Sequence, residues 1–118
     1  MVKNILVFMV LCILLLSCTK EDIPNSLDLG VWISLDKKDT LDFKTENHFL
    51  RSNEFMTSDN YDYSLNKDSI TIGYRGKMFV GVQPTTHNYS LQNNILTIDF
   101  TNEQCYGFDR EVIYYQKQ

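Results

Sequence analysis

The sequence predicts an all-β protein, a small antiparallel meander of about eight strands that closes into a barrel. Aromatic residues make up 13% of the 118 residues and alternate with Thr, Ser, Asp and Asn, while Ala is absent, which is a strand-forming composition. From residue 29 onward, short segments of alternating apolar and polar residues are separated by turn residues. We expect the sheet to close, because a flat sheet of this composition would leave an apolar face and two unpaired edges in water.

The predicted strands follow one another with short polar turns between them. The first strand covers residues 30–35, and residues 36–39 turn the chain. The next covers residues 40–44, with Leu41 and Phe43 on one face, and residues 48–51 follow. Residues 112–116 form the last strand.

An internal repeat organises the middle of the chain. Residues 63–72 (YSLNKDSITI) align without gaps on residues 89–98 (YSLQNNILTI). In each copy a Tyr-Ser-Leu strand enters a polar turn and leaves as an aliphatic strand, so the same β-hairpin is predicted twice.

Charge and motif content exclude several classes of function. Lys and Arg number 11 and Asp and Glu number 15, and without a basic cluster no nucleic-acid partner is expected. His48 and His87 lack the spacing of metal ligands, so neither a metal nor a cofactor is expected. No motif of a nucleophile, a metalloprotease or a phosphate-binding loop occurs, so we expect no enzymatic activity and no catalytic residue.

The N-terminal segment has the form of an export signal. Lys3 precedes an uncharged apolar run at residues 5–16, which is shorter than the about 20 residues of a membrane-spanning helix. Leu15-Leu16-Ser17-Cys18 follows and resembles the lipobox of bacterial lipoproteins. The resemblance implies that residues 1–17 are a signal peptide, that Cys18 becomes the first residue, and that Cys18 carries diacylglycerol and an amide-linked acyl chain such as palmitate. Several acyl chains hold a protein on a membrane durably.

The residues after Cys18 predict a tether. Thr19-Lys20-Glu21-Asp22 resembles an export signal that some Gram-negative lipoproteins carry, which implies the outer membrane and its cell-surface side. The stretch is polar and contains Pro24, so residues 18–28 are equally interpreted as a solvated, lipid-anchored linker. The folded domain is expected to cover residues 29–118.

The cysteines predict no disulfide framework. Cys12 lies in the apolar leader and Cys18 is assigned to the lipid, which leaves Cys105 alone. Cys105 has no basic neighbour in the sequence, so a buried, inert thiol is expected. The surrounding loop at residues 102–110 is polar and aromatic, and it could either be exposed, lining a barrel mouth or presenting a binding surface, or pack on the core as a lid.

Residues 29–117 resemble the small lipocalin-like domains of bacterial lipoproteins, on the strength of Gly30-X-Trp32, the meander and the last strand. The resemblance implies a lipocalin-like barrel in which Gly30 permits a close chain approach, Trp32 plugs one barrel end, and Arg110 stacks over Trp32. The Thr-Asp-Tyr motif of long lipocalins is missing and the domain is shorter than theirs, so its own side chains can fill the barrel.

Two hypotheses for function follow. The leading one is a lipid-anchored barrel that binds a small apolar or amphipathic ligand with inward aromatic residues. The predicted ligand-binding residues are Phe43, Phe49, Tyr61, Tyr63, Tyr74, Tyr89, Phe100 and Tyr114, with Leu91 and Ile98 on the same face. The alternative is a protein-interaction module of the cell envelope, namely an inhibitor, an immunity-type protein or an accessory subunit. A barrel of this size can lack room for a ligand, and residues 74–87 could present an exterior patch.

Overall fold

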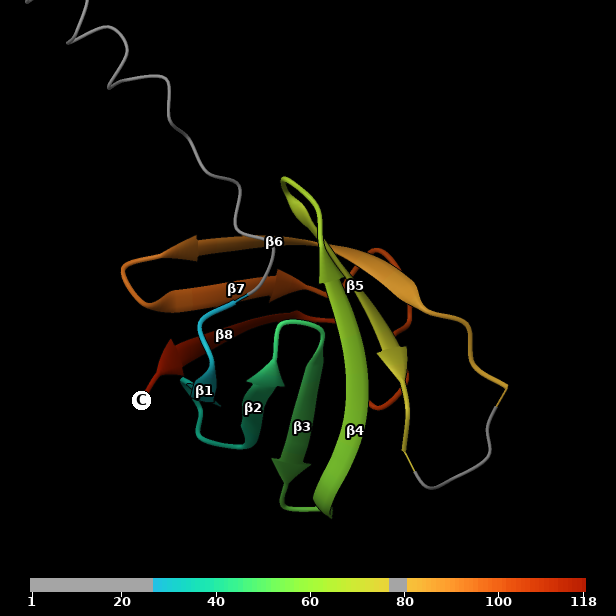
Figure 1. The fold of residues 1–118 in the computed structure, drawn as a ribbon, viewed down its shortest axis with the longest axis horizontal. Helices are drawn as coiled ribbons and strands as arrows, with labels where there is room; N and C mark the ends of the chain where they lie inside the picture. Colours follow the sequence, from blue (N-terminus) through green and yellow to red (C-terminus); the bar gives the residue numbers. More distant parts are fainter. Residues whose placement is uncertain (1–26, 77–80) are drawn as a thin grey trace, which may run out of the picture.

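The computed structural model, which describes residues 27–76 and 81–118, is a closed eight-stranded antiparallel β-barrel (Figure 1). Each strand pairs with the next in the chain, and the last pairs with the first, so the predicted all-β meander barrel is confirmed. The strands are β1 (Gly30–Ser34), β2 (Asp39–Thr45), β3 (His48–Asn53), β4 (Met56–Leu65), β5 (Ser69–Tyr74), β6 (Thr85–Gln92), β7 (Ile95–Asp99) and β8 (Val112–Lys117). The predicted leader, Cys18 and most of the predicted tether lie outside the described residues. Within the described ranges, no helix has the length and apolarity needed to cross a membrane.

The alternating strand directions gather the connections at two ends of the barrel. One end, called the loop end below, carries the turns at residues 35–38 and 54–55 and the connections that follow β5 and β7 (Figure 1). The other end, called the tether end, carries the turns within the hairpins β2–β3, β4–β5 and β6–β7. The chain enters there at Leu27, which is buried and whose backbone N–H donates a hydrogen bond to the Tyr63 hydroxyl at 3.3 Å. Leu27 is therefore part of the packed barrel.

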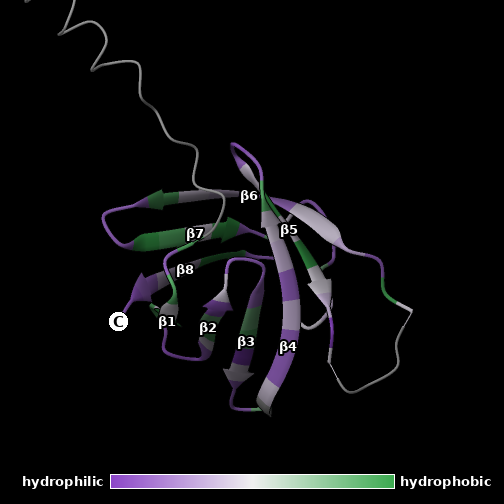
Figure 2. Cartoon of the chain, in the orientation of Figure 1, coloured by the Kyte–Doolittle hydropathy of each residue, from purple (hydrophilic) through white to green (hydrophobic). Residues whose placement is uncertain are grey.

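The sequence repeat folds into two equivalent hairpins. In β4–β5, Tyr63 lies opposite Ile72, and in β6–β7, Tyr89 lies opposite Ile98, so the aligned residues have the same strand register. The second hairpin turns through Asn93 and Asn94, whose φ angles of 53° and 62° fit the tight turn that joins twisted strands. Figure 2 shows apolar residues along β7, the aliphatic strand of this copy, and hydrophilic residues along much of β4.

The barrel interior is filled by its own aromatic side chains. Phe43 and Phe49 are 1% exposed and their ring centres lie 5.1 Å apart, while Tyr61, which stacks on Phe49 at 5.2 Å, has no exposed surface. At the loop end Phe100 stacks on Phe108, with ring centres 4.5 Å apart. A side chain that lines a cavity wide enough for a ligand keeps accessible surface, so these residues enclose no such space.

One residue predicted to face inward, Tyr114, faces outward. Tyr114 is 48% exposed, and Tyr115 takes its place in the core because its cross-strand partners are the buried Leu96 of β7 and Ser34 of β1. Tyr89 and Leu91 share the inward face, opposite the buried Ile98 and Leu96, but Tyr89 is only partly buried and Leu91 is exposed at the tether end. The prediction for Tyr114 is therefore wrong.

The cation that covers Trp32 is Lys117 rather than Arg110. Trp32 is buried, and the Lys117 ammonium lies 5.6 Å from the centre of its ring, because the two residues are directly opposite in the pairing of β1 with β8. Arg110 precedes β8 at the loop end, where its guanidinium donates to the Thr101 carbonyl at 2.8 Å. Gly30 has a φ of 116°, a backbone conformation that strains any residue with a side chain, so this position favours glycine.

Candidate functional site

The best-formed hollows of the described residues lie on the outside of the barrel. The candidate site is the one at the loop end, with a volume of about 280 Å³, and it is called the loop-end hollow below. It lies between the β1–β2 turn, the β3–β4 turn and the segment before β8. It is lined by Ser34, Asp36, Lys38, Asp39, Arg51, Asn53, Glu54, Phe55, Gly107, Asp109, Glu111 and Ile113.

A buried ion pair forms the floor of the hollow. The Nε of Arg51 lies 2.8 Å from Oδ1 of Asp39, and both side chains are under 10% exposed. The Tyr115 hydroxyl donates to the other oxygen of Asp39 at 2.6 Å. Arg51 also donates to the Gly107 carbonyl, and its guanidinium lies 3.7 Å from the centre of the Phe108 ring. These interactions of the pair therefore tie β2, β3 and β8 to one another and to the loop before β8.

The surroundings keep this pair charged and the nearby tyrosines neutral. Burial alone would lower the pKa of Arg51, but the negative charge of Asp39 and its hydrogen bond raise that pKa overall. Burial, followed by the charge of Asp39, raises the pKa of Tyr115 well above its usual value of 10.0. Burial likewise raises the pKa of Tyr61 to about 12. The floor therefore holds one cation and one anion in a fixed geometry at neutral pH.

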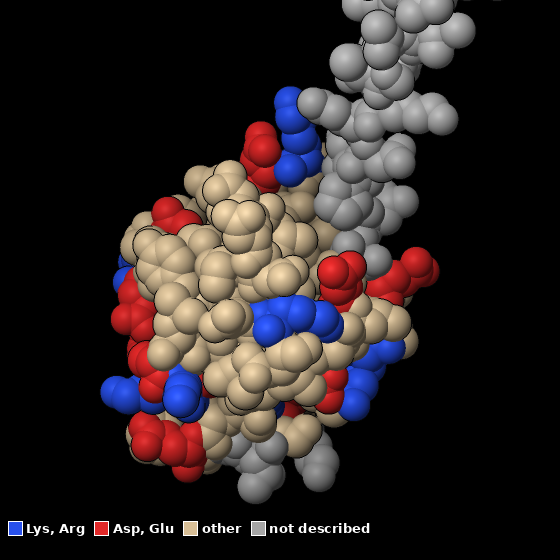
Figure 3. Space-filling view, turned by 90° about the vertical axis from the view of Figure 1, so that its left-hand side faces the viewer, with Lys and Arg blue, Asp and Glu red and all other residues tan. Residues whose placement is uncertain are grey.

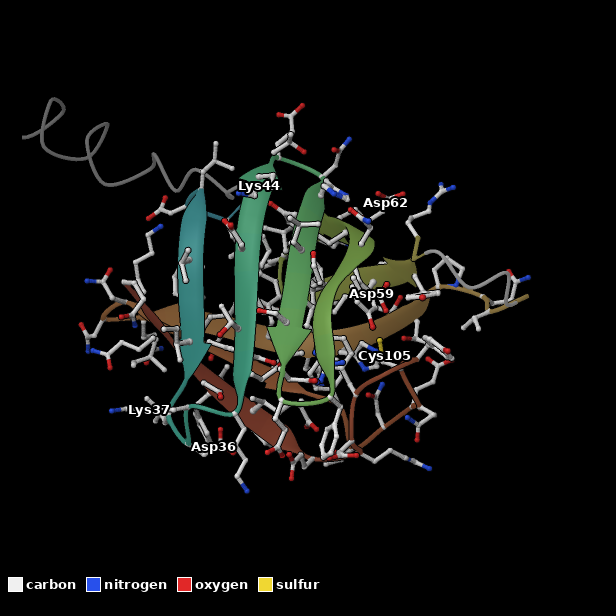
Figure 4. All side chains as sticks on the ribbon, turned by 90° about the horizontal axis from the view of Figure 1, so that it is seen from below. Asp36, Lys37, Lys44, Asp59, Asp62 and Cys105 are labelled. Atoms are coloured by element: carbon white, nitrogen blue, oxygen red, sulfur yellow. The ribbon has the colours of Figure 1, made fainter. Side chains whose placement is uncertain are left out.

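The segment between β7 and β8 packs on the core as a lid, which decides between the two interpretations of this loop. Two side chains of this segment, Phe108 and Cys105, are buried. The Tyr61 hydroxyl donates a hydrogen bond to the Tyr106 carbonyl at 3.0 Å. Cys105 lies within the ring of strands in Figure 4. Burial raises the pKa of the Cys105 thiol, so the thiol stays protonated, as an inert side chain requires.

A hydrogen-bonded histidine that the sequence did not single out fastens the lid to β6. His87 is buried, with Thr85 Oγ1 2.7 Å from its Nε2 and Asn102 Oδ1 3.1 Å from its Nδ1. The Asn102 amide nitrogen donates to the Thr86 carbonyl at 3.0 Å, so its Oδ1 accepts, and His87 carries its proton on Nδ1. Within the described part of the chain, no three His, Cys, Asp or Glu residues are grouped so that they could hold a metal ion.

The rim of the hollow combines an exposed aromatic ring with negative charge. Phe55 occupies the β3–β4 turn and is 87% exposed. Besides the buried pair, the lining carries four carboxylates and one ammonium group, and these belong to Asp36, Glu54, Asp109, Glu111 and Lys38.

Asp36 is a fixed anion of this rim. Its carboxylate accepts hydrogen bonds from the Ser34 hydroxyl at 2.6 Å and the Lys38 backbone N–H at 3.0 Å, and these bonds lower the pKa of Asp36. Figure 4 shows Asp36 at the outer edge of the β1–β2 turn.

Most of the predicted ligand-binding residues lie in the packed core, and two of them contribute to a second hollow. Tyr63 and Tyr74 help to line an outer groove of about 400 Å³ over β4 and β5, together with Val82 and Pro84. An exposed ion pair between Arg75 and Asp62, 2.6 Å apart, borders this groove. A smaller hollow of about 200 Å³ beside β8 includes Tyr114, the predicted residue that faces outward.

The fold and these hollows define a meander β-barrel with a packed interior and sites on its outer surface. Compared with known proteins, the chain matches no family model, no curated protein and no solved structure.

The ion pair yields a prediction for stability. Arg51→Met leaves the Asp39 carboxylate buried without its cation, and we expect the free energy of unfolding to fall by about 3–5 kcal/mol. Lys44→Met, which breaks an exposed pair with Asp42, is the matched control and should cost under about 1 kcal/mol. Adding Asp39→Leu to Arg51→Met should recover part of the loss, because no unpaired charge remains. Urea unfolding measures all three, and equal losses for Arg51→Met and Lys44→Met would refute the buried pair.

The raised pKa of Tyr61 predicts a loss of stability in alkali. Folding raises this pKa from 10.0 to about 12, so the contribution of the neutral phenol is complete below pH 10 and disappears as the pH rises through about 12. We expect the unfolding free energy of Tyr61→Phe to fall less steeply above pH 10 than that of the wild type. Urea unfolding between pH 9 and pH 11.5 tests this, and parallel pH profiles would show that Tyr61 is not buried as a neutral phenol.

Proposed function

We propose that this protein is a lipid-anchored module of the bacterial cell envelope that binds a partner protein through its loop end. The observation that carries the proposal is Phe55, a large aromatic residue left 87% exposed on the rim of a hollow. With the barrel interior filled, binding is assigned to the outer surface. Exposed aromatic residues at such positions are frequent anchors of protein–protein interfaces.

The proposed lipid anchor determines which way the loop end faces relative to the membrane. The proposed lipid is on Cys18, which precedes Leu27 by nine residues, a length that spans at most about 30 Å when extended. Leu27 enters at the tether end. A barrel held in this way turns its tether end toward an outer membrane and offers its loop end to proteins in the surrounding space.

The charges around Phe55 indicate the chemistry of the partner. Four carboxylates against one ammonium group on the rim repel an acidic surface and attract a basic one, which raises the rate of encounter with a basic partner. The buried Arg51 and Asp39 beneath them hold the loop in a fixed position, so little ordering is needed when a partner binds. We therefore assign the partner a basic surface with an apolar pocket that accepts the Phe55 ring.

A capture experiment with matched variants tests the proposal. The full-length chain carrying a C-terminal tag is expressed in its own host, and proteins bound in envelope extracts are identified by quantitative mass spectrometry. A partner should be retained by the wild type and by Leu91→Ala, which alters an exposed residue at the tether end, and reduced at least tenfold by Phe55→Ala. A protein retained equally by all three would show that the loop end is not the binding surface.

The outer groove supports a second candidate, the binding of a small amphipathic ligand. Its volume of about 400 Å³ lies in the range of small-molecule sites. Val82 and Pro84 give it apolar surface beside the charged groups of Asp62 and Arg75, a combination that suits an amphipathic ligand.

One measurement tests both the anchor and this ligand. Native mass spectrometry of the full-length product purified from host membranes should give the mass of residues 18–118 plus acyl groups. A mass that retains residues 1–17 without lipid would contradict the anchor. A small molecule released on denaturation would support the groove as a ligand site, and a reproducibly ligand-free mass would count against it.

A further inference from the structure

One outer face of the barrel is almost free of charged side chains. No Asp, Glu, Lys or Arg occurs from residue 82 to residue 98, and the outward positions of β6, β7, β8 and β1 form three rows across the sheet. The first row contains Ser90, Thr97, Tyr114 and Leu35, joined by strand pairing and by the hydrogen bond from Leu35 N–H to the Tyr114 carbonyl. The second contains Gln92, Ile95, Gln116 and Ile33.

The third row closes this face at the loop end. It contains Asn88, Asp99 and Val112, and Asp99 is the one acid of the three rows. Its carboxylate accepts hydrogen bonds from the Thr101 hydroxyl and backbone N–H. The three rows together are called the neutral face below.

Charged residues gather on other parts of the surface. Asp42 and Lys44 pair on the outside of β2, and Asp62 pairs with Arg75 over β4 and β5. Figure 3 shows a wide uncharged area on the side of the barrel that carries the β6–β7 turn, with charged side chains mostly at its borders. Three large apolar residues of the neutral face, Leu35, Val112 and Tyr114, are each more than a third exposed.

We propose that the neutral face binds the neutral face of a second copy of this chain. The protein has a net charge of −4, so two copies repel each other through any surface that carries this charge. The neutral face escapes that repulsion, and a two-fold axis would place it against the same face of the other copy. Tyr114 lies in the middle of the face with Thr97 and Leu35 on its two sides, where a homodimer would bury it.

The size of the face sets the strength of the dimer. Four strands about 4.8 Å apart and three rows of side chains cover about 15 Å by 15–20 Å. Two such faces bury less than about 1,000 Å² in total, which is typical of weak, reversible association. Anchoring on one membrane confines the copies to a thin layer and raises their effective concentration, so association is favoured there over dilute solution.

Cross-linking in the membrane tests the dimer with the full-length chain. A photo-reactive amino acid at Gln116, an exposed position in the second row, should give an adduct with twice the mass of the chain upon irradiation. The same amino acid at Lys44, which is also exposed but lies on the charged side, should give at least tenfold less of this adduct. Ser90→Glu adds a carboxylate to each of the two apposed faces and should reduce the Gln116 adduct at least tenfold.

The possible outcomes separate this inference from the proposed partner at the loop end. No adduct at Gln116, an adduct of any other mass, equal yields at Gln116 and Lys44, or no effect of Ser90→Glu would each overturn the dimer. Gln116 and Ser90 line no part of the loop-end hollow, so either result leaves the role of Phe55 untouched. Far-UV circular dichroism of Ser90→Glu shows whether the barrel is intact.

Discussion

The packing of aromatic side chains inside a closed barrel is the constraint on which the rest of the structure depends. Closure between β1 and β8 leaves no unpaired strand edge among the eight strands. Phe43, Phe49 and Tyr61 then fill the interior, with at most 1% of each side chain exposed. Such a barrel has no free strand edge and no internal cavity at which a partner or ligand could bind. Binding therefore depends on its loops and on the outward residues of its strands.

The buried pair of Arg51 and Asp39 connects this core to the surface. Asp39 opens β2, Arg51 lies near the end of β3, and Tyr115 comes from β8, so three strands meet at one charge-assisted network. Arg51 also holds Gly107 and Phe108 of the lid. The loop end is therefore a rigid part of the fold. Phe55 lies exposed on the rim of the loop-end hollow and does not pack into the core.

Much of the fold follows from local sequence, whereas the candidate site does not. Alternation and turn residues predicted the strands, and the repeat predicted two hairpins of identical register. Tyr114 and Tyr115 are adjacent tyrosines, so the sequence pattern fits either one facing inward, and only the long-range pairing with β1 and β7 decides. The same closure brings Lys117 rather than Arg110 to Trp32. The sequence pattern does not single out Arg51, Asp39 or Phe55, because burial at the loop end depends on contacts distant in sequence.

Xenon binding followed by NMR tests the filled interior most directly. Xenon enters apolar cavities that water leaves empty, and it needs no specific recognition. Backbone amide spectra recorded under increasing xenon pressure should show no saturable shifts for β2, β3 and β7 if the core is packed as described. Saturable shifts centred on Phe43, Phe49 and Phe100 would reveal an internal cavity, and they would return ligand binding to the inside of the barrel.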